Sequence, residues 1–205
     1  MSAESAEPGT VRPGGRTARV RAAVLRAAGD VLAERGFAHL DLADVARRAG
    51  VGKTTVYRRW GTVSALVADL LGDMAEQSVP RADTGSVLGD LRANADLVRR
   101  TLADPRQGAL FRAVIAAGAC DARTAEAVRR FYEVRVAEWA PCVEQGVVRG
   151  ELPEGTDAAA VVRAVSAPLY YGLLTRGVVP GVADAEGAAC AAVAAAQAGV
   201  FVVRG

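Results

Sequence analysis

The feature that most constrains this chain is a pair of short helical patterns joined by a tight turn. Residues 41–60 read DLADVARRAGVGKTTVYRRW. The apolar residues of the first half recur at the three- and four-residue spacing of an amphipathic helix: Leu42, Val45, Ala46 and Ala49. Gly50-Val51-Gly52 interrupts this pattern, and a second short helix is expected over 53–60. Two short helices that meet at a glycine-containing turn predict a helix-turn-helix unit.

The lysine of the second helix has two possible interpretations. Gly52-Lys53-Thr54 resembles the end of a nucleotide-binding P-loop, whose pattern is GxxxxGK[ST]. That motif needs another glycine at position 47, where this chain has an arginine, and the preceding residues have helical rather than strand spacing. The sequence therefore argues against a P-loop.

The second interpretation is a helix that binds nucleic acid. Val56 and Trp60 lie at i and i+4 and are expected to face inward, which leaves only cationic, hydroxylic and tyrosine side chains outside. Residues 1–60 contain 11 Arg or Lys against 6 Asp or Glu, whereas residues 61–205 contain 14 against 17. A basic N-terminal part joined to a mildly acidic remainder is typical of a nucleic-acid-binding module with a second domain. An ordinary solvated charged face is the alternative.

The rest of the chain also has helical spacing. A helix over 16–35 ends at Gly36, a suitable C-terminal cap, and Asp41 and Thr62 are suitable N-caps for the second and fourth helices. Further helices are expected at 63–77, 86–103, 106–118, 122–149, 157–176 and 184–203. No convincing alternation indicates a strand, so we predict an all-α fold of about nine helices. We expect a disordered basic arm (1–15), a helix-turn-helix domain (16–62) and a C-terminal domain (63–205).

The segment FAHLDLADVARRAGVGKTTVYRRWGTVSALV resembles the DNA-binding domain of the TetR family of transcriptional repressors. The match covers about residues 16–70 and depends on spacing, turn and aromatic residues together: Gly36-Phe37, Val45-Ala46, Ala49-Gly50-Val51, Tyr57, Trp60 and Leu66. Three positions depart from the family pattern. Asp41 replaces a usual Thr and keeps the capping oxygen, whereas Gly52 replaces a usual Ser and has no hydroxyl. Val63 replaces a common Lys that helps to hold a backbone phosphate.

The resemblance implies a homodimer that places two recognition helices in the major groove of a near-palindromic operator in double-stranded DNA. It implies repression that is relieved by a small-molecule effector bound in the C-terminal domain, with no cofactor, metal or catalytic residue. The expected groove or phosphate contacts are Lys53, Thr54, Thr55, Tyr57 and Arg58. Thr17, Arg47 and Arg48 are expected to touch the flanking backbone, together with the basic arm around Arg12, Arg16 and Arg19.

The C-terminal part predicts an interface and a pocket. The last two helices are rich in Ala, Val and Gly and carry few charges, which favours a dimer interface over plain core packing. Arg163 interrupts this apolar surface and is expected at its rim. Aromatic residues form only 5% of the chain but gather between 110 and 175, where they could line an apolar ligand cavity or fill a core. The expected ligand contacts are Phe111, Ile115, Trp139 and Tyr171.

Two other function classes are weighed against a regulator. An enzyme is not supported, because the single histidine, His39, has no partner motif and the three cysteines are far apart. A helical adaptor that binds another protein and has weakened DNA binding stays open because of Gly52 and Val63. The first residues contain no apolar run, so no signal peptide or membrane span is expected, and the cysteine spacing fits a reducing cytoplasm.

Overall fold

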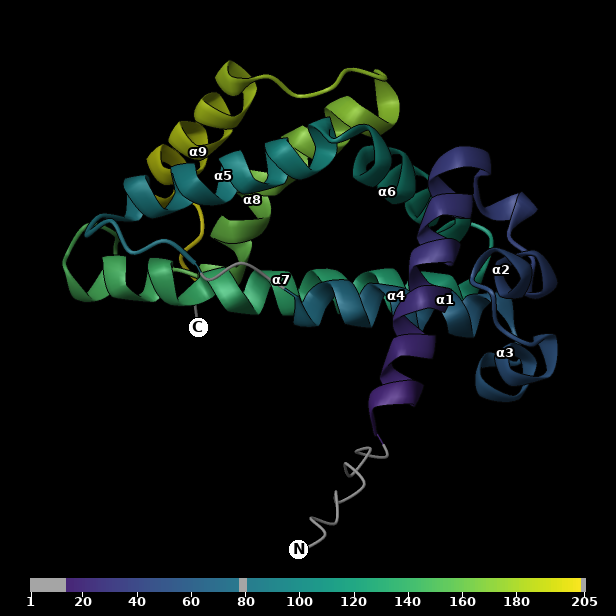
Figure 1. The fold of residues 1–205 in the computed structure, drawn as a ribbon. Helices are drawn as coiled ribbons and strands as arrows, with labels where there is room; N and C mark the ends of the chain where they lie inside the picture. Colours follow the sequence, from purple (N-terminus) through teal and green to yellow (C-terminus); the bar gives the residue numbers. More distant parts are fainter. Residues whose placement is uncertain (1–13, 78–80, 204–205) are drawn as a thin grey trace, which may run out of the picture.

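The computed structural model describes residues 14–77 and 81–203. Within these ranges it contains nine α-helices, one short 3-10 helix (η1, Phe37–His39) and no strand (Figure 1). The helices are α1 (Gly14–Arg35), α2 (Leu42–Arg48), α3 (Lys53–Trp60), α4 (Val63–Glu76), α5 (Val87–Ala103), α6 (Pro105–Gly118), α7 (Ala122–Val148), α8 (Ala158–Thr175) and α9 (Val182–Gln197). The all-α prediction is confirmed. The expected basic arm lies outside the described residues, except that residues 14 and 15 already belong to α1.

Capping side chains explain most of the helix starts. The residue before each of six helices accepts a hydrogen bond from a backbone N–H of the first turn, which satisfies a group that the helix itself cannot pair. These residues are Asp41, Thr62, Ser86, Asp104, Asp121 and Asp157. The predictions for Asp41 and Thr62 are therefore confirmed. In α9 the carboxylate of Asp184 instead accepts from the Gly181 N–H, 2.7 Å away.

The end of the last helix differs from the prediction. The apolar sequence suggested a helix to residue 203, but α9 ends at Gln197 and the chain turns at Gly199, whose φ is 76°. The left-handed region is accessible to glycine because it has no Cβ, and this ends the helix. Beyond the turn, Val202 forms an isolated antiparallel bridge with Thr156. The Asp157 N–H also donates to the Phe201 carbonyl at 2.8 Å, so the chain end is tied to the start of α8.

The helices form a small N-terminal unit beside a larger helical body. We call α1, α2 and α3, residues 14–60, the reading head. Figure 1 shows the reading head at one end of the molecule and α5, α8 and α9 toward the other, with α7 running along the body between them. Its 27 residues correspond to about 40 Å of helix. α4 packs against both α1 and α7, and α6 packs against α1, so the reading head is joined to the body through these two helices.

The apolar residues form two core clusters. The first includes Val24, Val56, Leu66 and Phe111, and therefore runs from the reading head through α4 into α6. The second joins α5, α8 and α9 with the C-terminal half of α7, around residues such as Trp139. The head is thus not packed as an independent core.

α8 combines a buried face with an exposed apolar one. Val161, Val165 and Leu169 are buried, and the helix packs against α5, α7 and α9. Tyr171 and Leu174 on the same helix are 63% and 40% exposed. Among the described helices, α8 is the one whose length and hydropathy also meet the minimum for a membrane span. That criterion is weak for a single helix that is packed into a helical body.

Candidate functional site

The turn between α2 and α3 fixes the orientation of the second helix. Gly50 has φ 65°, in the left-handed region that favours glycine. The Val51 N–H then donates to the Ala46 carbonyl at 2.9 Å, which closes the turn on the end of α2. Gly52 is the N-cap of α3 with φ −61° and ψ 133°, and it provides no side-chain cap. The turn therefore presents the first N–H groups of α3 without a competing side-chain oxygen.

α3 separates a buried face from a cationic one. Val56 and Trp60 are buried, as predicted from their spacing. Lys53, the only lysine of the chain, is exposed, as are Thr54, Tyr57, Arg58 and Arg59, while Thr55 is partly buried. Tyr57 is 47% exposed, a large fraction for an aromatic side chain in a small helical unit. The outward face can bind an anionic backbone and offers hydroxyl and guanidinium groups to base edges.

A shallow concave surface joins the start of α1 to α3. Thr17 and Arg16 of α1 lie along it together with Thr55, Arg58 and Arg59. The structure thus brings Thr17 together with two of the predicted α3 residues. It also adds Arg59, whose guanidinium lies 5.2 Å from the centre of the Trp60 ring. The described lining of this surface contains three arginines and no acid, which favours a phosphate.

The two arginines of α2 differ in their surroundings. Arg47 is exposed and pairs with Asp44 on its own helix. Arg48 is only 22% exposed and lies 2.8 Å from Glu34 and 3.2 Å from Asp44. Neither lines the concave surface. The structure therefore gives Arg48 a role in joining α2 to α1, and its predicted backbone contact stays a prediction, as does that of Arg47.

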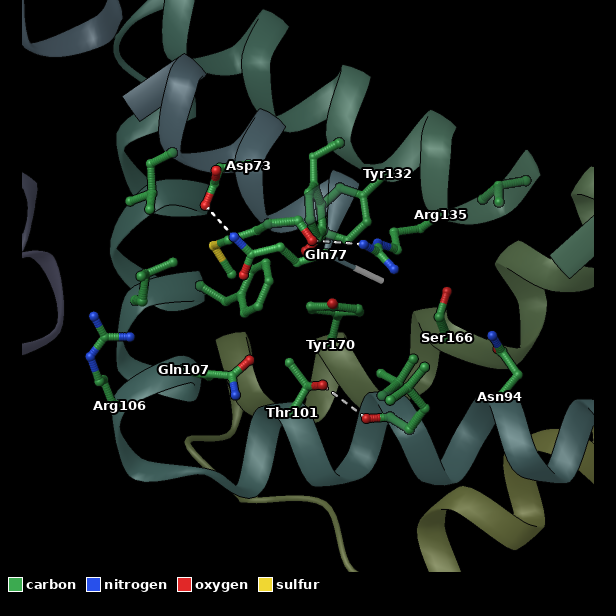
Figure 2. Close-up of a pocket in the computed structure, with 18 of the residues that line it drawn as sticks. Asp73, Gln77, Asn94, Thr101, Arg106, Gln107, Tyr132, Arg135, Ser166 and Tyr170 are labelled. Carbon is green, nitrogen blue, oxygen red and sulfur yellow. Dashed lines mark hydrogen bonds between the residues drawn. The ribbon is translucent and has the colours of Figure 1, made fainter. Parts of the chain in front are cut away.

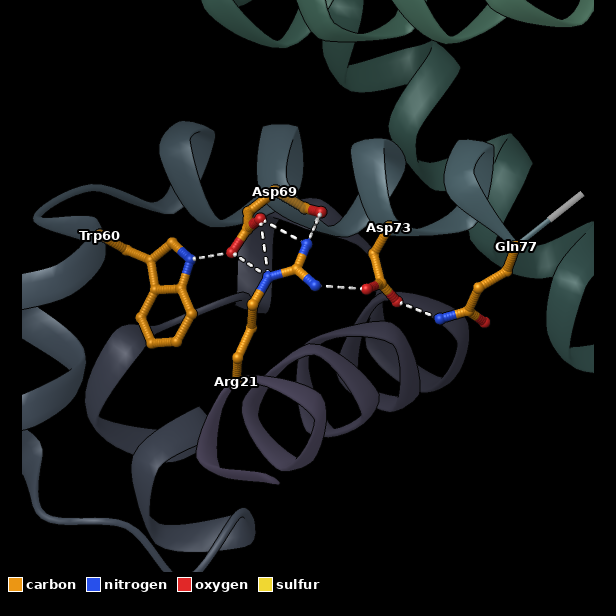
Figure 3. A network of polar contacts seen from close by, with 5 residues as sticks. All are labelled: Arg21, Trp60, Asp69, Asp73 and Gln77. Carbon is orange, nitrogen blue, oxygen red and sulfur yellow. Dashed lines mark hydrogen bonds and ion pairs between the residues drawn. The ribbon is translucent and has the colours of Figure 1, made fainter. Parts of the chain in front are cut away.

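A polar network anchors the last residue of α3 to α4 (Figure 3). The Trp60 indole N–H donates to Asp69 at 2.9 Å. Arg21 of α1 donates to the same carboxylate at 2.7 Å and to Asp73, one turn further along α4, at 2.5 Å. The Gln77 amide donates to Asp73 at 2.7 Å. One chain of hydrogen bonds thus connects the recognition helix, α1 and the C-terminal end of α4.

The network changes the acid–base properties of its members. Partial burial has the largest single effect on Asp69 and raises its pKa, but the hydrogen bonds from Arg21 and Trp60 and the positive charges of Arg21 and Arg59 outweigh it. The net result is a pKa of Asp69 below its usual value. The pKa of Arg21 is raised, chiefly by its hydrogen bond to Asp69. Both groups are therefore charged at neutral pH, as an ion pair requires.

A cavity of about 590 Å³ lies in the body against the end of the reading head (Figure 2). Its volume is in the range that holds drug-sized molecules. Six helices contribute to its wall: α1, α4, α5, α6, α7 and α8. Asp73 and Gln77 belong both to this wall and to the network that reaches Trp60. A ligand in the cavity would therefore touch residues connected to the recognition helix.

Two of the four residues predicted to contact a ligand line this cavity. Phe111 and Trp139 do, but Ile115 and Tyr171 do not. Ile115 packs against the first core cluster instead. Tyr171 is 63% exposed, because the neighbouring position, Tyr170, takes the inward direction on α8 and successive helical residues point about 100° apart. Ile115 and Tyr171 therefore lie outside the lining of this cavity, and their contact with a ligand stays a prediction.

The cavity wall contains a cluster of aromatic rings that the sequence did not resolve. The Phe111 and Phe131 rings are 5.4 Å apart, and the Tyr132 and Tyr170 rings meet edge to face at 5.2 Å. Tyr170 also contacts Phe111 edge to face at 6.4 Å. Such geometries stabilise aromatic pairs beyond their buried area. Four aromatic rings therefore meet at one part of the wall.

The residues considered for other chemistry are not assembled into a site. Nδ1 of His39 lies 2.9 Å from the Arg35 carbonyl oxygen at an exposed position. Burial raises the pKa of the Cys142 thiol, which makes it less reactive. Cys120 is exposed and Cys190 is partly exposed. In the part of the chain that the structure describes, no group of three His, Cys, Asp or Glu side chains could hold a metal.

Comparison with known proteins agrees with this architecture. Residues 24–70 match the model of "Bacterial regulatory proteins, tetR family". Residues 81–193 match that of "Tetracyclin repressor-like, C-terminal domain". The first match runs from within α1 to within α4, and the second runs from the residues before α5 into α9.

Individual relatives give the same result. The chain is 34% identical to the uncharacterized HTH-type transcriptional regulator YdeS of Bacillus subtilis, over 76% of this chain and 78% of YdeS. It is 36% identical to the HTH-type transcriptional regulator AqdR of Rhodococcus erythropolis, over 72% of this chain and 70% of AqdR.

Solved structures agree in fold. The TetR family transcription regulator SCO0332 superposes with a TM-score of 0.69 at 29% identity, covering 86% of this chain and 97% of SCO0332. A TetR transcriptional regulator from Agrobacterium tumefaciens gives a TM-score of 0.64 at 21% identity, covering 85% of this chain and 92% of that one. With both of its parts matched and its helices arranged in the same way, the chain belongs to the TetR family of helix-turn-helix transcriptional regulators.

Proposed function

We propose that this regulator is a repressor that binds a near-palindromic operator as a homodimer and is released by a small molecule in the cavity. The observation that carries the proposal is the outward face of α3, where Lys53, Tyr57 and Arg58 are exposed and no acid interrupts the cationic surface. Thr17 and Thr55 extend this surface with hydroxyl groups that suit phosphate contacts.

Release would act through α4. Leu70, Asp73, Met74 and Gln77 all line the cavity from this helix. The guanidinium of Arg135, on α7, donates to the carbonyl oxygens of Met74 and Ala75 at 2.8 and 2.9 Å. A molecule that moves these groups shifts the end of α4, and the Asp69 carboxylate then carries the shift to Trp60. A ligand would then make different contacts in the two positions of the reading head, which is what an allosteric effect requires.

The homodimer would use α8 and α9. Tyr171, Leu174 and Val182 expose apolar surface on these helices or at their junction. The exposed face of α9 has small residues at Ala183, Gly187, Ala191 and Ala194, so a second helix pair could approach closely. Arg163 is exposed and lies 3.8 Å from Asp157, which agrees with a position at the rim. A two-fold dimer would place its recognition helices one DNA turn apart, on two symmetric half-sites.

The test is selection of random duplexes by the full-length protein, followed by titration of the enriched site at several salt concentrations. We expect a two-fold symmetric site whose affinity falls steeply as salt increases, because phosphate contacts release counterions. Lys53→Ala should lower the slope of log affinity against log salt by about 1, and Tyr57→Ala should weaken binding by roughly tenfold.

Arg100→Ala is the matched control. This residue is 63% exposed and pairs with Asp96 on its own helix, α5. It should change neither the affinity nor the slope. Enrichment of no symmetric site, with weak binding that ignores salt, would contradict the repressor and favour the protein-binding adaptor.

A further inference from the structure

Three of the four charged side chains that line the cavity are paired within the protein, and the fourth, Arg26, is exposed to solvent. Arg135 lies 3.0 Å from Glu138 and Arg106 lies 2.7 Å from Asp30. Asp73 is held by Arg21 at 2.5 Å. A charged ligand would lose its hydration without finding an uncompensated partner in the interior. A cation would in addition meet three lining arginines against one lining acid.

Three buried polar atoms of the wall have no hydrogen-bond partner among the described residues. They are Oδ1 of Asn94, a residue only 4% exposed, the hydroxyl of Tyr132 and Nε of Arg135. They come from facing helices, since Asn94 belongs to α5, and Tyr132 and Arg135 belong to α7 (Figure 2). Buried polar atoms are nearly always paired, so three such atoms on one cavity indicate groups that a bound molecule completes.

Of these three atoms, Oδ1 of Asn94 needs a hydrogen-bond donor, whereas the Tyr132 hydroxyl and the Arg135 Nε–H can donate to an acceptor. Oδ1 of Asn94 accepts hydrogen bonds only, so it requires a donor. Burial raises the pKa of Tyr132 well above its usual value and that of Tyr170 to about 12. Both phenols are therefore protonated at neutral pH, and the Tyr132 hydroxyl can donate to an acceptor.

The remaining wall is apolar and aromatic. Phe111, Phe131 and Tyr170 present ring faces and edges toward the same space, and Trp139 is 4% exposed beside them. Flat rings pack well against such a surface, because edge-to-face and offset contacts add to the burial of area.

We propose that the cavity binds an uncharged, largely aromatic molecule that gives a hydrogen-bond donor to Asn94 and an acceptor to the Tyr132 hydroxyl. The inference rests on the proposed function only in treating this cavity as the effector site. It is tested by binding alone, without DNA.

Four naphthalenes of similar size separate the chemical classes. They are 2-naphthol, 2-methoxynaphthalene, 2-naphthoate and 2-naphthylmethylammonium, each titrated into the full-length protein at pH 7 by calorimetry. We expect 2-naphthol to bind at least about tenfold more tightly than either charged compound, because three of the four charged side chains of the wall are already paired. 2-Methoxynaphthalene, which has lost the donor, should bind roughly five- to tenfold more weakly than 2-naphthol.

Variants locate the hydrogen bonds. Asn94→Leu should abolish the difference in affinity between 2-naphthol and 2-methoxynaphthalene. Tyr132→Phe, which keeps the ring, should weaken the binding of both compounds by a similar factor. Thr101→Val is the control, because this residue lines the same cavity from α5 but its hydroxyl already donates to the Leu97 carbonyl at 2.9 Å. It should leave the ranking unchanged.

The ranking of the four compounds by the unmodified protein is decisive even if Asn94→Leu does not fold. Equal or tighter binding of 2-naphthoate or of the ammonium compound overturns the inference, and so does the absence of binding by all four. An unmodified protein that ranks the compounds as expected but enriches no operator would refute the proposed function and leave this inference standing.

Discussion

The hydrogen-bond network around Arg21 predicts a measurable effect of one substitution. In Arg21→Met the aliphatic part of the side chain is kept, but Asp69 and Asp73 lose the guanidinium that lies between them. The two carboxylates belong to successive turns of α4 and would repel each other. Trp60 would keep a partner in Asp69, but that partner would no longer be held in position from α1.

The expected loss of stability follows from burial. Exposed ion pairs contribute about 0.2–1 kcal/mol, whereas removal of one partner of a buried pair costs about 3–5 kcal/mol. The three side chains are 24%, 27% and 21% exposed, which places the network between these limits. We therefore expect Arg21→Met to lower the free energy of unfolding by about 2 kcal/mol, which corresponds to a fall in Tm of roughly 4–8 °C.

The effect should depend on pH with a defined sign. The pKa of Asp69 is lowered in the folded protein, so the ion pair contributes its full stabilisation above the unfolded value of about 4. That stabilisation is lost as pH falls through the lower folded value. The difference between the unmodified protein and Arg21→Met should therefore be constant near neutrality and shrink below about pH 4.

Urea unfolding followed by circular dichroism and by tryptophan fluorescence measures both quantities. The matched control is Arg100→Met, which removes an ion pair of 3.3 Å to Asp96 on the same helix at a site that is 63% exposed. The control substitution should lower the free energy of unfolding by less than about 0.5 kcal/mol. Equal losses in the two variants, or a difference that grows in acid, would refute the reasoning.

Two further predictions concern backbone and cap. Gly108→Ala should lower the free energy of unfolding by about 1–3 kcal/mol, because the new Cβ would collide with the carbonyl oxygen of Leu102. Gly72→Ala should raise it by about 0.5–1 kcal/mol, because Gly72 is an exposed helical residue with nothing within 4 Å of the new Cβ. Thermal melts of the two variants that shift in the same direction would contradict this. Asp41→Ala should lower stability by about 1 kcal/mol, since its carboxylate accepts two N–H groups of α2, while Asp41→Thr should retain most of it. Equal losses for Ala and Thr at this position would show that the cap contributes nothing.

The reading head could be predicted because its determinants are local. Helix period, the glycine turn and the caps act within a few residues, and the outward direction of Tyr57 follows from the burial of Val56 and Trp60. The network through Arg21 and Asp69 could not be predicted in this way, because its members are 48 residues apart and the pairing depends on how α1 crosses α4.

The cavity shows the same limit more clearly. Clustering of aromatic residues predicted its region and two of its lining side chains, Phe111 and Trp139. Tyr170 and Tyr171 are adjacent and chemically identical, so composition offers no means to choose between them. The choice depends on how α8 is rotated against α7, which is a property of the packed body. Asn94 had no local signal at all, since a single Asn in an amphipathic helix is usually solvated.

The continuous first core cluster also determines where this molecule can be cut. A fragment that ended at residue 62 would remove Leu66, Val67 and Leu71, which fill the space beside Val24 and Val56, and would deprive the Trp60 indole of Asp69. An isolated recognition module made in that way would lose part of its own interior. The smallest separable unit therefore includes α4, and α4 is also a wall of the cavity. The helix-turn-helix unit and the wall of the cavity share one helix, so neither can be transplanted to another protein without it.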